Sequence, residues 1–145
     1  MVKLILTLLF VAFTATWAMA QNSVPGTATL YKNPNCGCCE GYATYLRNNG
    51  FTVVVKPTHE LNRISREAGV PEDFQGCHTM FIDGYVVGGH VPVATVRKLL
   101  KERPNIKGIS LPGMPQGSPG MSGVKSEPWK IYAVGKGRPT VYTTE

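Results

Sequence analysis

The sequence lacks the residue patterns that mark several large classes of protein. It has no glycine-rich phosphate loop, no serine nucleophile elbow and no pair of carboxylates spaced for acid–base catalysis. It also has no stripe of interleaved aromatic and basic residues suited to nucleic acid. These absences argue against a phosphate-loop enzyme, a serine hydrolase and a nucleic-acid-binding protein.

Acidic residues are also few, with 9 Asp and Glu against 15 Lys and Arg, and the formal net charge is +6. The positive charge is scattered, and its densest group, near residue 100, is typical of a solvated helix face. The 145 residues suffice for one domain with one core. Apolar residues make up 43% of the chain, which argues against intrinsic disorder.

Residues 1–20 have the three parts of a secretory signal peptide. Lys3 provides a basic start, Leu4 to Trp17 is uncharged and mostly apolar, and Ala18-Met19-Ala20 is an A-x-A cleavage site. The alternative is an uncleaved membrane anchor, but the apolar run is short for a span of ~20 residues. We therefore expect an exported protein that begins at Gln21, has lost the charge of Lys3 and has no membrane contact after cleavage.

The hydrophobic pattern predicts alternating strands and helices over residues 27–103. Strands are predicted at 27–31 and 51–55, where the unbroken valine run 53–55 suits burial on both faces. A hairpin is predicted over 79–83 and 85–87, turning at Asp83-Gly84. The three predicted helices cover 36–49, which ends at Gly50, 59–68, and the segment from Pro92 to the residue before Pro104. This β-α-β-α-β-β-α order resembles the α/β thioredoxin fold.

The C-terminal part has a different composition. Residues 111–123 are dominated by proline, glycine and serine, and they contain Pro-Gly-Met twice, ending at Met114 and Met121. A last β-hairpin is predicted over 129–134 and 140–143. We expect this extension to pack on the same domain, so that residues 21–145 form one unit.

Three of the four cysteines lie together in Cys36-Gly37-Cys38-Cys39, at the predicted start of the first helix. Helix N-termini stabilise thiolates, and clustered thiolates bind Cu(I), Zn(II) or similar soft ions. Cys36 and Cys39 also have the Cys-x-x-Cys spacing of a thiol–disulfide catalyst. The motif is specific for metal binding or thiol redox chemistry and does not choose between these two; the alternative is a local disulfide with spare thiols.

Cys77 and His78 precede the third predicted strand. If this strand runs antiparallel beside the first, its beginning lies near the loop of Cys36, so a fourth sulfur and an imidazole converge on one place. Both are metal-ligand types. The alternatives are a buried apolar-like thiol for Cys77 and a hydrogen-bonded polar residue at a strand start for His78.

Three further residues are candidate ligands. Met114 and Met121 lie in a polar loop where a core role is less expected, and a thioether suits Cu(I) without deprotonation. The alternative is that they are apolar plugs that pin the loop to the domain. His90, two residues before Pro92, is either a ligand, a group that supports a ligand, or a partner of the adjacent turn.

Four motifs occur in the same order as in a known family. They are Asn35-Cys36-Gly37-Cys38-Cys39, Gly76-Cys77-His78-Thr79, Gly89-His90-Val91-Pro92 and Leu111-Pro112-Gly113-Met114-Pro115-Gln116-Gly117-Ser118-Pro119-Gly120-Met121. Nearly the whole mature chain resembles the CopG-type periplasmic copper-resistance proteins. The resemblance implies a thioredoxin-like fold, a periplasmic location, copper held by cysteine sulfur with help from histidine and methionine, and a change between Cu(I) and Cu(II).

The first hypothesis is therefore a periplasmic copper-tolerance protein that binds copper ions and works with other periplasmic copper-handling proteins. Its expected main ligands are Cys36, Cys38, Cys39 and Cys77; His78, Met114 and Met121 complete or cover the site, and His90 is a further candidate. The second is a periplasmic thiol–disulfide oxidoreductase with Cys36 as the nucleophile and Cys39 as the resolving thiol. The third is a secreted interaction module stabilised by disulfides.

Overall fold

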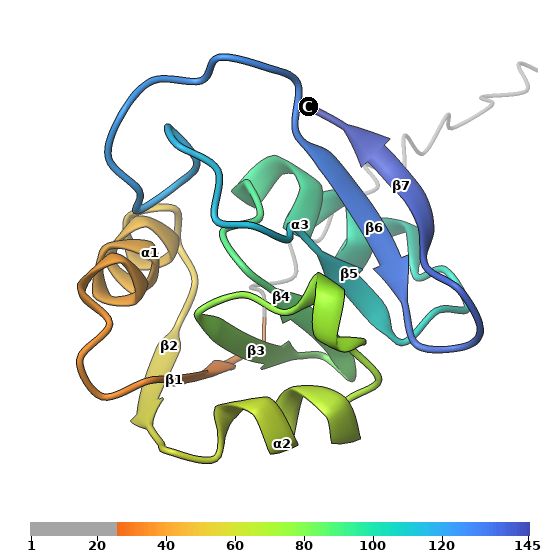
Figure 1. Cartoon of the computed structure of the whole chain (residues 1–145), viewed down its shortest axis with the longest axis horizontal. Coiled ribbons are helices and arrows are strands. Elements are labelled where there is room, and N and C mark those ends of the chain that lie inside the picture. The colour runs from red at the N-terminus through yellow and green to blue at the C-terminus, as the bar shows by residue number, and fades with distance from the viewer. Residues whose placement is uncertain (1–25) are drawn as a thin grey trace, which may run out of the picture.

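A mixed seven-stranded β-sheet runs through residues 26–145, the part of the chain that the computed structural model describes. Its strand order is β2-β1-β3-β4-β5-β6-β7 (Figure 1). The predicted signal peptide, residues 1–20, lies outside the described residues. None of the described helices is long and apolar enough to cross a membrane.

The first half of the sheet is built from β1 (Ala28–Lys32), β2 (Val53–Pro57), β3 (His78–Ile82) and β4 (Tyr85–Gly88). The second half is built from β5 (Gly108–Ser110), β6 (Lys130–Val134) and β7 (Thr140–Thr144). β1 pairs in parallel with β2 and antiparallel with β3, and β4 pairs antiparallel with β3. The parallel β4–β5 pair and the antiparallel β5–β6 and β6–β7 pairs join the C-terminal hairpin to the same sheet.

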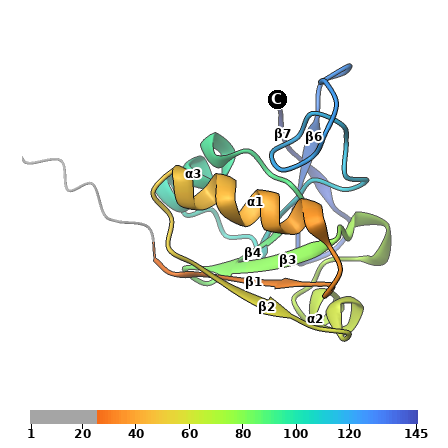
Figure 2. The same ribbon diagram turned by 90° about the vertical axis from the view of Figure 1, so that its left-hand side faces the viewer.

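The helices cover both faces of the sheet. Helices α1 (Gly37–Asn48) and α3 (Val93–Glu102) lie on one face, and α2 (Leu61–Glu67) lies on the other (Figure 2). The main core includes Leu30, Met80 and Val87 from the sheet and Leu46 and Leu99 from the helices, each fully buried. A smaller apolar cluster is formed by Val70, Val86 and Val134.

Helix α1 has its first residues fixed by a cysteine. Cys36 is the N-cap with extended backbone, and its sulfur accepts a hydrogen bond from the Cys39 N–H at 3.3 Å. Such a bond satisfies one of the amides that a helix start leaves without a partner. The helix ends before Gly50, whose φ of +86° is the left-handed conformation that the sequence predicts there. The cysteine motif is thus held at a well-defined helix start.

Two expectations need correction. The predicted element order omits β5 and the 3₁₀ helix η1 (Glu72–Phe74), because both are only three residues long and carry no periodic pattern. The expected burial of the 53–55 valine run on both faces is wrong, since β2 is an edge strand and Val54 is 45% exposed. The three helices, the central hairpin and the C-terminal hairpin occur where the pattern predicts them, within a few residues at each end.

Candidate metal centre

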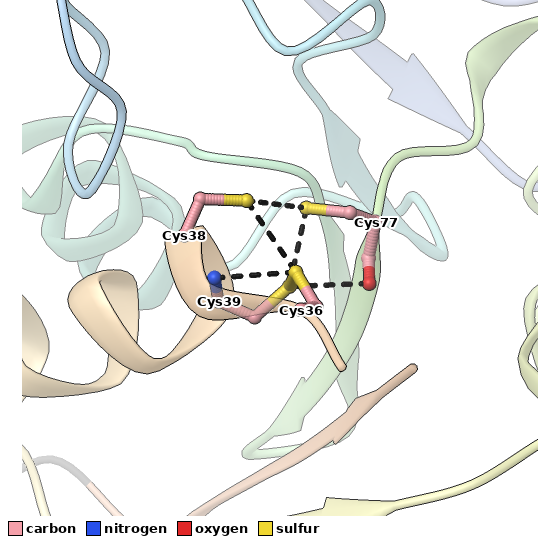
Figure 3. A group of neighbouring side chains, drawn as sticks. All are labelled: Cys36, Cys38, Cys39 and Cys77. Atoms are coloured by element: carbon pink, nitrogen blue, oxygen red, sulfur yellow. Dashed lines mark hydrogen bonds between the residues drawn. A yellow bond between two sulfur atoms is a disulfide. The ribbon is translucent and has the colours of Figure 1, made fainter. Parts of the chain in front are cut away.

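Two chain segments separated by about forty residues meet at the start of α1. Cys36 lies in the loop after β1, Cys38 and Cys39 lie in the first turn of α1, and Cys77 immediately precedes β3 (Figure 3). The antiparallel register pairs Lys32, the last residue of β1, with His78, the first residue of β3. The end of β1 and the beginning of β3 therefore lie at the same edge, and the two segments meet as the sequence predicts.

The four cysteine sulfur atoms lie within 4.8 Å of one another. Sγ of Cys39 is 3.2 Å from Sγ of Cys77, and Sγ of Cys38 is 3.4 Å from Sγ of Cys36 and 3.6 Å from Sγ of Cys77. Cys39 is fully buried, and the other three are half-buried. Four sulfurs at this spacing form a compact donor set for soft cations.

Part of this cysteine cluster is oxidised in the structure. Cys36 and Cys39 form a disulfide, whereas Cys38 and Cys77 are free thiols. The thiolate is the form of cysteine that binds a metal. Cys36 and Cys39 can therefore act as thiolate ligands only after two electrons have reduced their disulfide.

His90 is oriented toward Cys77 by a hydrogen bond on its other side. His90 Nδ1 lies 2.6 Å from the carbonyl oxygen of Pro119, and because that oxygen can only accept, Nδ1 carries the proton. The Nε2 lone pair then faces Cys77 Sγ at 3.1 Å and accepts from the thiol. This arrangement, an imidazole fixed by a backbone carbonyl, is common among metal-binding histidines.

His78 also lies beside Cys77, in a buried aromatic stack. Its ring stacks on Tyr42 with centroids 4.6 Å apart and meets the His90 ring edge-on at 4.9 Å. Nδ1 is 3.7 Å from Cys77 Sγ, and Nε2 is a buried nitrogen with no hydrogen-bond partner among residues 26–145. Burial, and to a lesser degree His90, lowers the pKa of His78 to about 3. Burial also lowers the pKa of His90, so both imidazoles are neutral at physiological pH and keep a free lone pair.

The Cys77 thiol is protonated in the metal-free protein. Burial and, to a lesser degree, the nearby Cys38 together raise its pKa to about 12, while the positive charge of Lys32 acts in the opposite direction. A metal that binds here must therefore displace a proton from Cys77.

The two Pro-Gly-Met segments are placed differently. Gly120 packs against the first turns of α1, because a Cβ on Gly120 would lie 2.8 Å from the Cys38 carbonyl oxygen. Met121, the next residue, is half-buried, while Met114 is 40% exposed. The second segment therefore reaches the cysteine helix through its backbone, and the first lies at the surface.

Sequence reasoning did not single out three residues that shape the site. Tyr42 is fully buried against the rings of both histidines and donates a hydrogen bond from its hydroxyl to the Val91 carbonyl at 2.8 Å. Gly41 lies directly opposite Gly120, with its would-be Cβ 3.1 Å from the Gly120 carbonyl oxygen. Lys32 is buried at the end of β1. Only Tyr42 could have been found from the sequence, because it lies three residues after Cys39 on the same predicted helix, a spacing that places the two on one face.

Fold and site together define the class. The protein is an α/β protein in which thiols and neutral imidazoles converge at a helix start, a donor set suited to a soft metal or to thiol redox chemistry.

Comparison with known proteins is consistent with this class. A family described as a protein of unknown function, DUF411, matches residues 74–121. Two solved structures, described as copper resistance protein CopG in form 1 and form 2, each share 35% sequence identity with this chain. Each superposition has a TM-score of 0.76 and covers 83% of this chain and 98% of the other. No curated protein sequence matches the chain. The chain belongs to the CopG family of copper-resistance proteins.

Proposed function

We propose that this chain binds Cu(I) through the reduced thiolates of Cys36, Cys38, Cys39 and Cys77. The observation that carries the proposal is the meeting of four sulfurs from two separate segments within 4.8 Å. Cu(I) prefers such soft donors, and thiolates this close together are able to bridge more than one ion. The two related structures described as copper resistance proteins support copper as the metal.

Histidine and methionine complete the proposed site. His78 and His90 are neutral, and each has a ring nitrogen close to Cys77 Sγ, so either can supply an imidazole nitrogen. Met121, and with a movement of the surface loop Met114, would supply thioether sulfur. The bound copper supplies the redox chemistry of the site. The protein's contribution is to hold the donors together, keep the imidazoles neutral and give up the Cys77 proton.

The same residues allow copper to change its oxidation state. Oxidation of the Cys36 and Cys39 thiolates to their disulfide releases two electrons, which reduce two Cu(II) to two Cu(I). Reduction of the disulfide by two Cu(I) is the reverse reaction. We further propose that the protein acts in copper tolerance in the periplasm after removal of residues 1–20. In this proposal β2-β1-β3-β4 with α1 and α3 form a thioredoxin-like unit to which β5–β7 are added.

An anaerobic titration of the reduced, metal-free protein with Cu(I), against a chromophoric Cu(I) chelator, tests the proposal. We expect wild type to take copper from the chelator and the variant Cys36→Ser/Cys39→Ser to lose most of this capacity. His59→Gln, a substitution of an exposed histidine outside the site, is the matched control and should bind like wild type. Unchanged binding in the double variant would exclude the cysteine cluster as the site.

Thiol–disulfide exchange is the second candidate function, and the Cys36–Cys39 disulfide favours it. In that reaction, the Cys36 thiolate of the reduced protein attacks a substrate disulfide, and Cys39 then displaces the substrate thiol. Rapid insulin reduction by the metal-free protein in the presence of dithiothreitol, lost in Cys36→Ser, would support this function. Turnover no faster than dithiothreitol alone would exclude it.

A further inference from the structure

Lys32 is a buried lysine beside the cysteine cluster. Its side chain is only 3% exposed, which is costly for an ammonium group unless every N–H finds a partner. Nζ donates to the carbonyl oxygens of Asn33 at 3.1 Å and Pro34 at 3.0 Å, and it lies 3.2 Å from a carboxylate oxygen of Glu40. All three N–H groups are therefore used.

These partners belong to the two parts of the chain that present the cysteines. Asn33 and Pro34 are in the loop that leads to Cys36, and Glu40 is in the first turn of α1, next to Cys39. The ammonium group thus ties the loop to the helix start. Because it bonds backbone carbonyls, it limits the positions that Cys36 can take relative to Cys38 and Cys39.

The charge of Lys32 is only partly balanced by its own ion pair. The Glu40 side chain is 57% exposed, so water screens its carboxylate, whereas the ammonium group is shielded from water. Lys32 also pairs across the sheet with His78, the residue after Cys77. A fixed positive charge therefore stands beside a cluster that carries up to four negative charges when its thiols ionise.

We propose that Lys32 is a positioning residue that holds the cysteine loop on α1 and uses its buried charge to stabilise the reduced, thiolate form of the cluster. For the copper-loaded state the inference rests on the proposed function. Four thiolates with one Cu(I) keep a net charge of −3, so a neighbouring cation favours loading as well as reduction. The charge effect distinguishes this role from simple loop anchoring.

The first test measures the thiols without metal. Metal-free protein is equilibrated at about pH 8 with mixtures of reduced and oxidised glutathione, and the Cys36–Cys39 disulfide is quantified by alkylation and mass spectrometry. Each disulfide reduced takes two electrons from two glutathione thiols, which leave as glutathione disulfide. Lys32→Met and Lys32→Gln should lower the equilibrium constant for reduction of the disulfide about tenfold. The reason is that a nearby positive charge typically lowers the pKa of a thiol by one or more units, and these variants remove that charge. Lys32→Arg, which keeps the charge, should remain near wild type.

Glu40→Gln is the matched control, since it removes the screened partner and leaves the lysine charge in place. If Lys32→Met fails to fold by circular dichroism, Lys32→Gln carries the test, because its amide can still donate to the loop carbonyls. A folded Lys32→Gln with the wild-type reduction constant would overturn the inference and leave Lys32 as a loop anchor only.

The second test measures Cu(I) affinity for the same variants by anaerobic chelator competition. We expect about tenfold weaker binding in the neutral variants and recovery in Lys32→Arg. If wild type binds no Cu(I) while the neutral variants still change the reduction constant, the proposed function fails and the role of Lys32 toward the thiols stands. If wild type binds Cu(I) and the neutral variants match it in both tests, the proposed function stands and the inference fails.

Discussion

Gly120→Ala tests how tightly the loop after β5 must pack on the cysteine helix. Gly120 has φ +83°, and a Cβ at this position would lie 2.5 Å from the Tyr42 backbone nitrogen and 2.8 Å from the Cys38 carbonyl oxygen. Both neighbours are helix backbone and cannot rotate away, so the loop must move. The movement stretches the hydrogen bond between His90 and the Pro119 carbonyl oxygen, 2.6 Å long in the structure.

The expected loss has two parts. The left-handed conformation costs an alanine about 1 kcal/mol, and the displaced loop with its broken hydrogen bond costs about 1–2 kcal/mol more. Gly113→Ala is the matched control, because Gly113 has a similar φ of +77° but nothing within 4 Å of its would-be Cβ. We therefore expect Gly120→Ala to lower the free energy of unfolding by about 2–3 kcal/mol and Gly113→Ala by about 1 kcal/mol.

Urea unfolding of the oxidised, metal-free variants, followed by circular dichroism, measures both values. A chelator competition on the reduced proteins should show weaker Cu(I) binding in Gly120→Ala only, since only that variant releases His90 from its carbonyl partner. Equal losses of stability in the two variants would refute the close packing of Gly120 on α1.

Three further predictions follow from buried groups. The pKa of His78 in the folded protein lies below its unfolded value of about 6.5. Burying the neutral imidazole therefore contributes fully to the free energy of unfolding above about pH 6.5, and this contribution is lost as the pH falls toward about 3. Between about pH 7 and pH 5, wild type should lose about 2 kcal/mol more than His78→Phe in urea unfolding, and equal losses would contradict a buried neutral His78. Cu(I) must displace the Cys77 proton, so its affinity should rise at least about tenfold per pH unit from about pH 6 to pH 8, and a flat profile would argue against binding at Cys77. Tyr42→Phe leaves the buried Val91 carbonyl without its hydroxyl donor and should cost about 1–2 kcal/mol of stability. Tyr45→Phe is the comparison: it removes the acceptor of the Val93 N–H, but at a half-buried ring where water can replace the hydroxyl, so it should cost less.

The site was predictable where local chemistry and strand direction decide the arrangement. Cysteines before an amphipathic segment predict a helix start, and an antiparallel strand after β1 brings Cys77 to that start. Neither step needs side-chain detail. The hydrophobic pattern likewise located the helices and both hairpins, because each spans several residues of regular periodicity.

Other features depend on contacts that no local pattern encodes. β5 is three residues long, and its strand conformation comes from pairing with β4 and β6 on either side. A lysine at a strand end is ordinarily exposed, so the burial of Lys32 follows only from the loop that folds over it. The packing of Gly120 on α1 joins residues about eighty positions apart. The Cys-x-x-Cys spacing is compatible with both a metal site and a disulfide, and the structure has the disulfide.

The most direct test of the account is copper K-edge X-ray absorption on the reduced protein loaded with Cu(I) under anaerobic conditions. We predict a first coordination shell dominated by sulfur, with a clear loss of sulfur scattering in Cys77→Ser and in Cys36→Ser/Cys39→Ser. A first shell of nitrogen and oxygen that is unchanged in both variants would contradict a copper site built from these converging thiols.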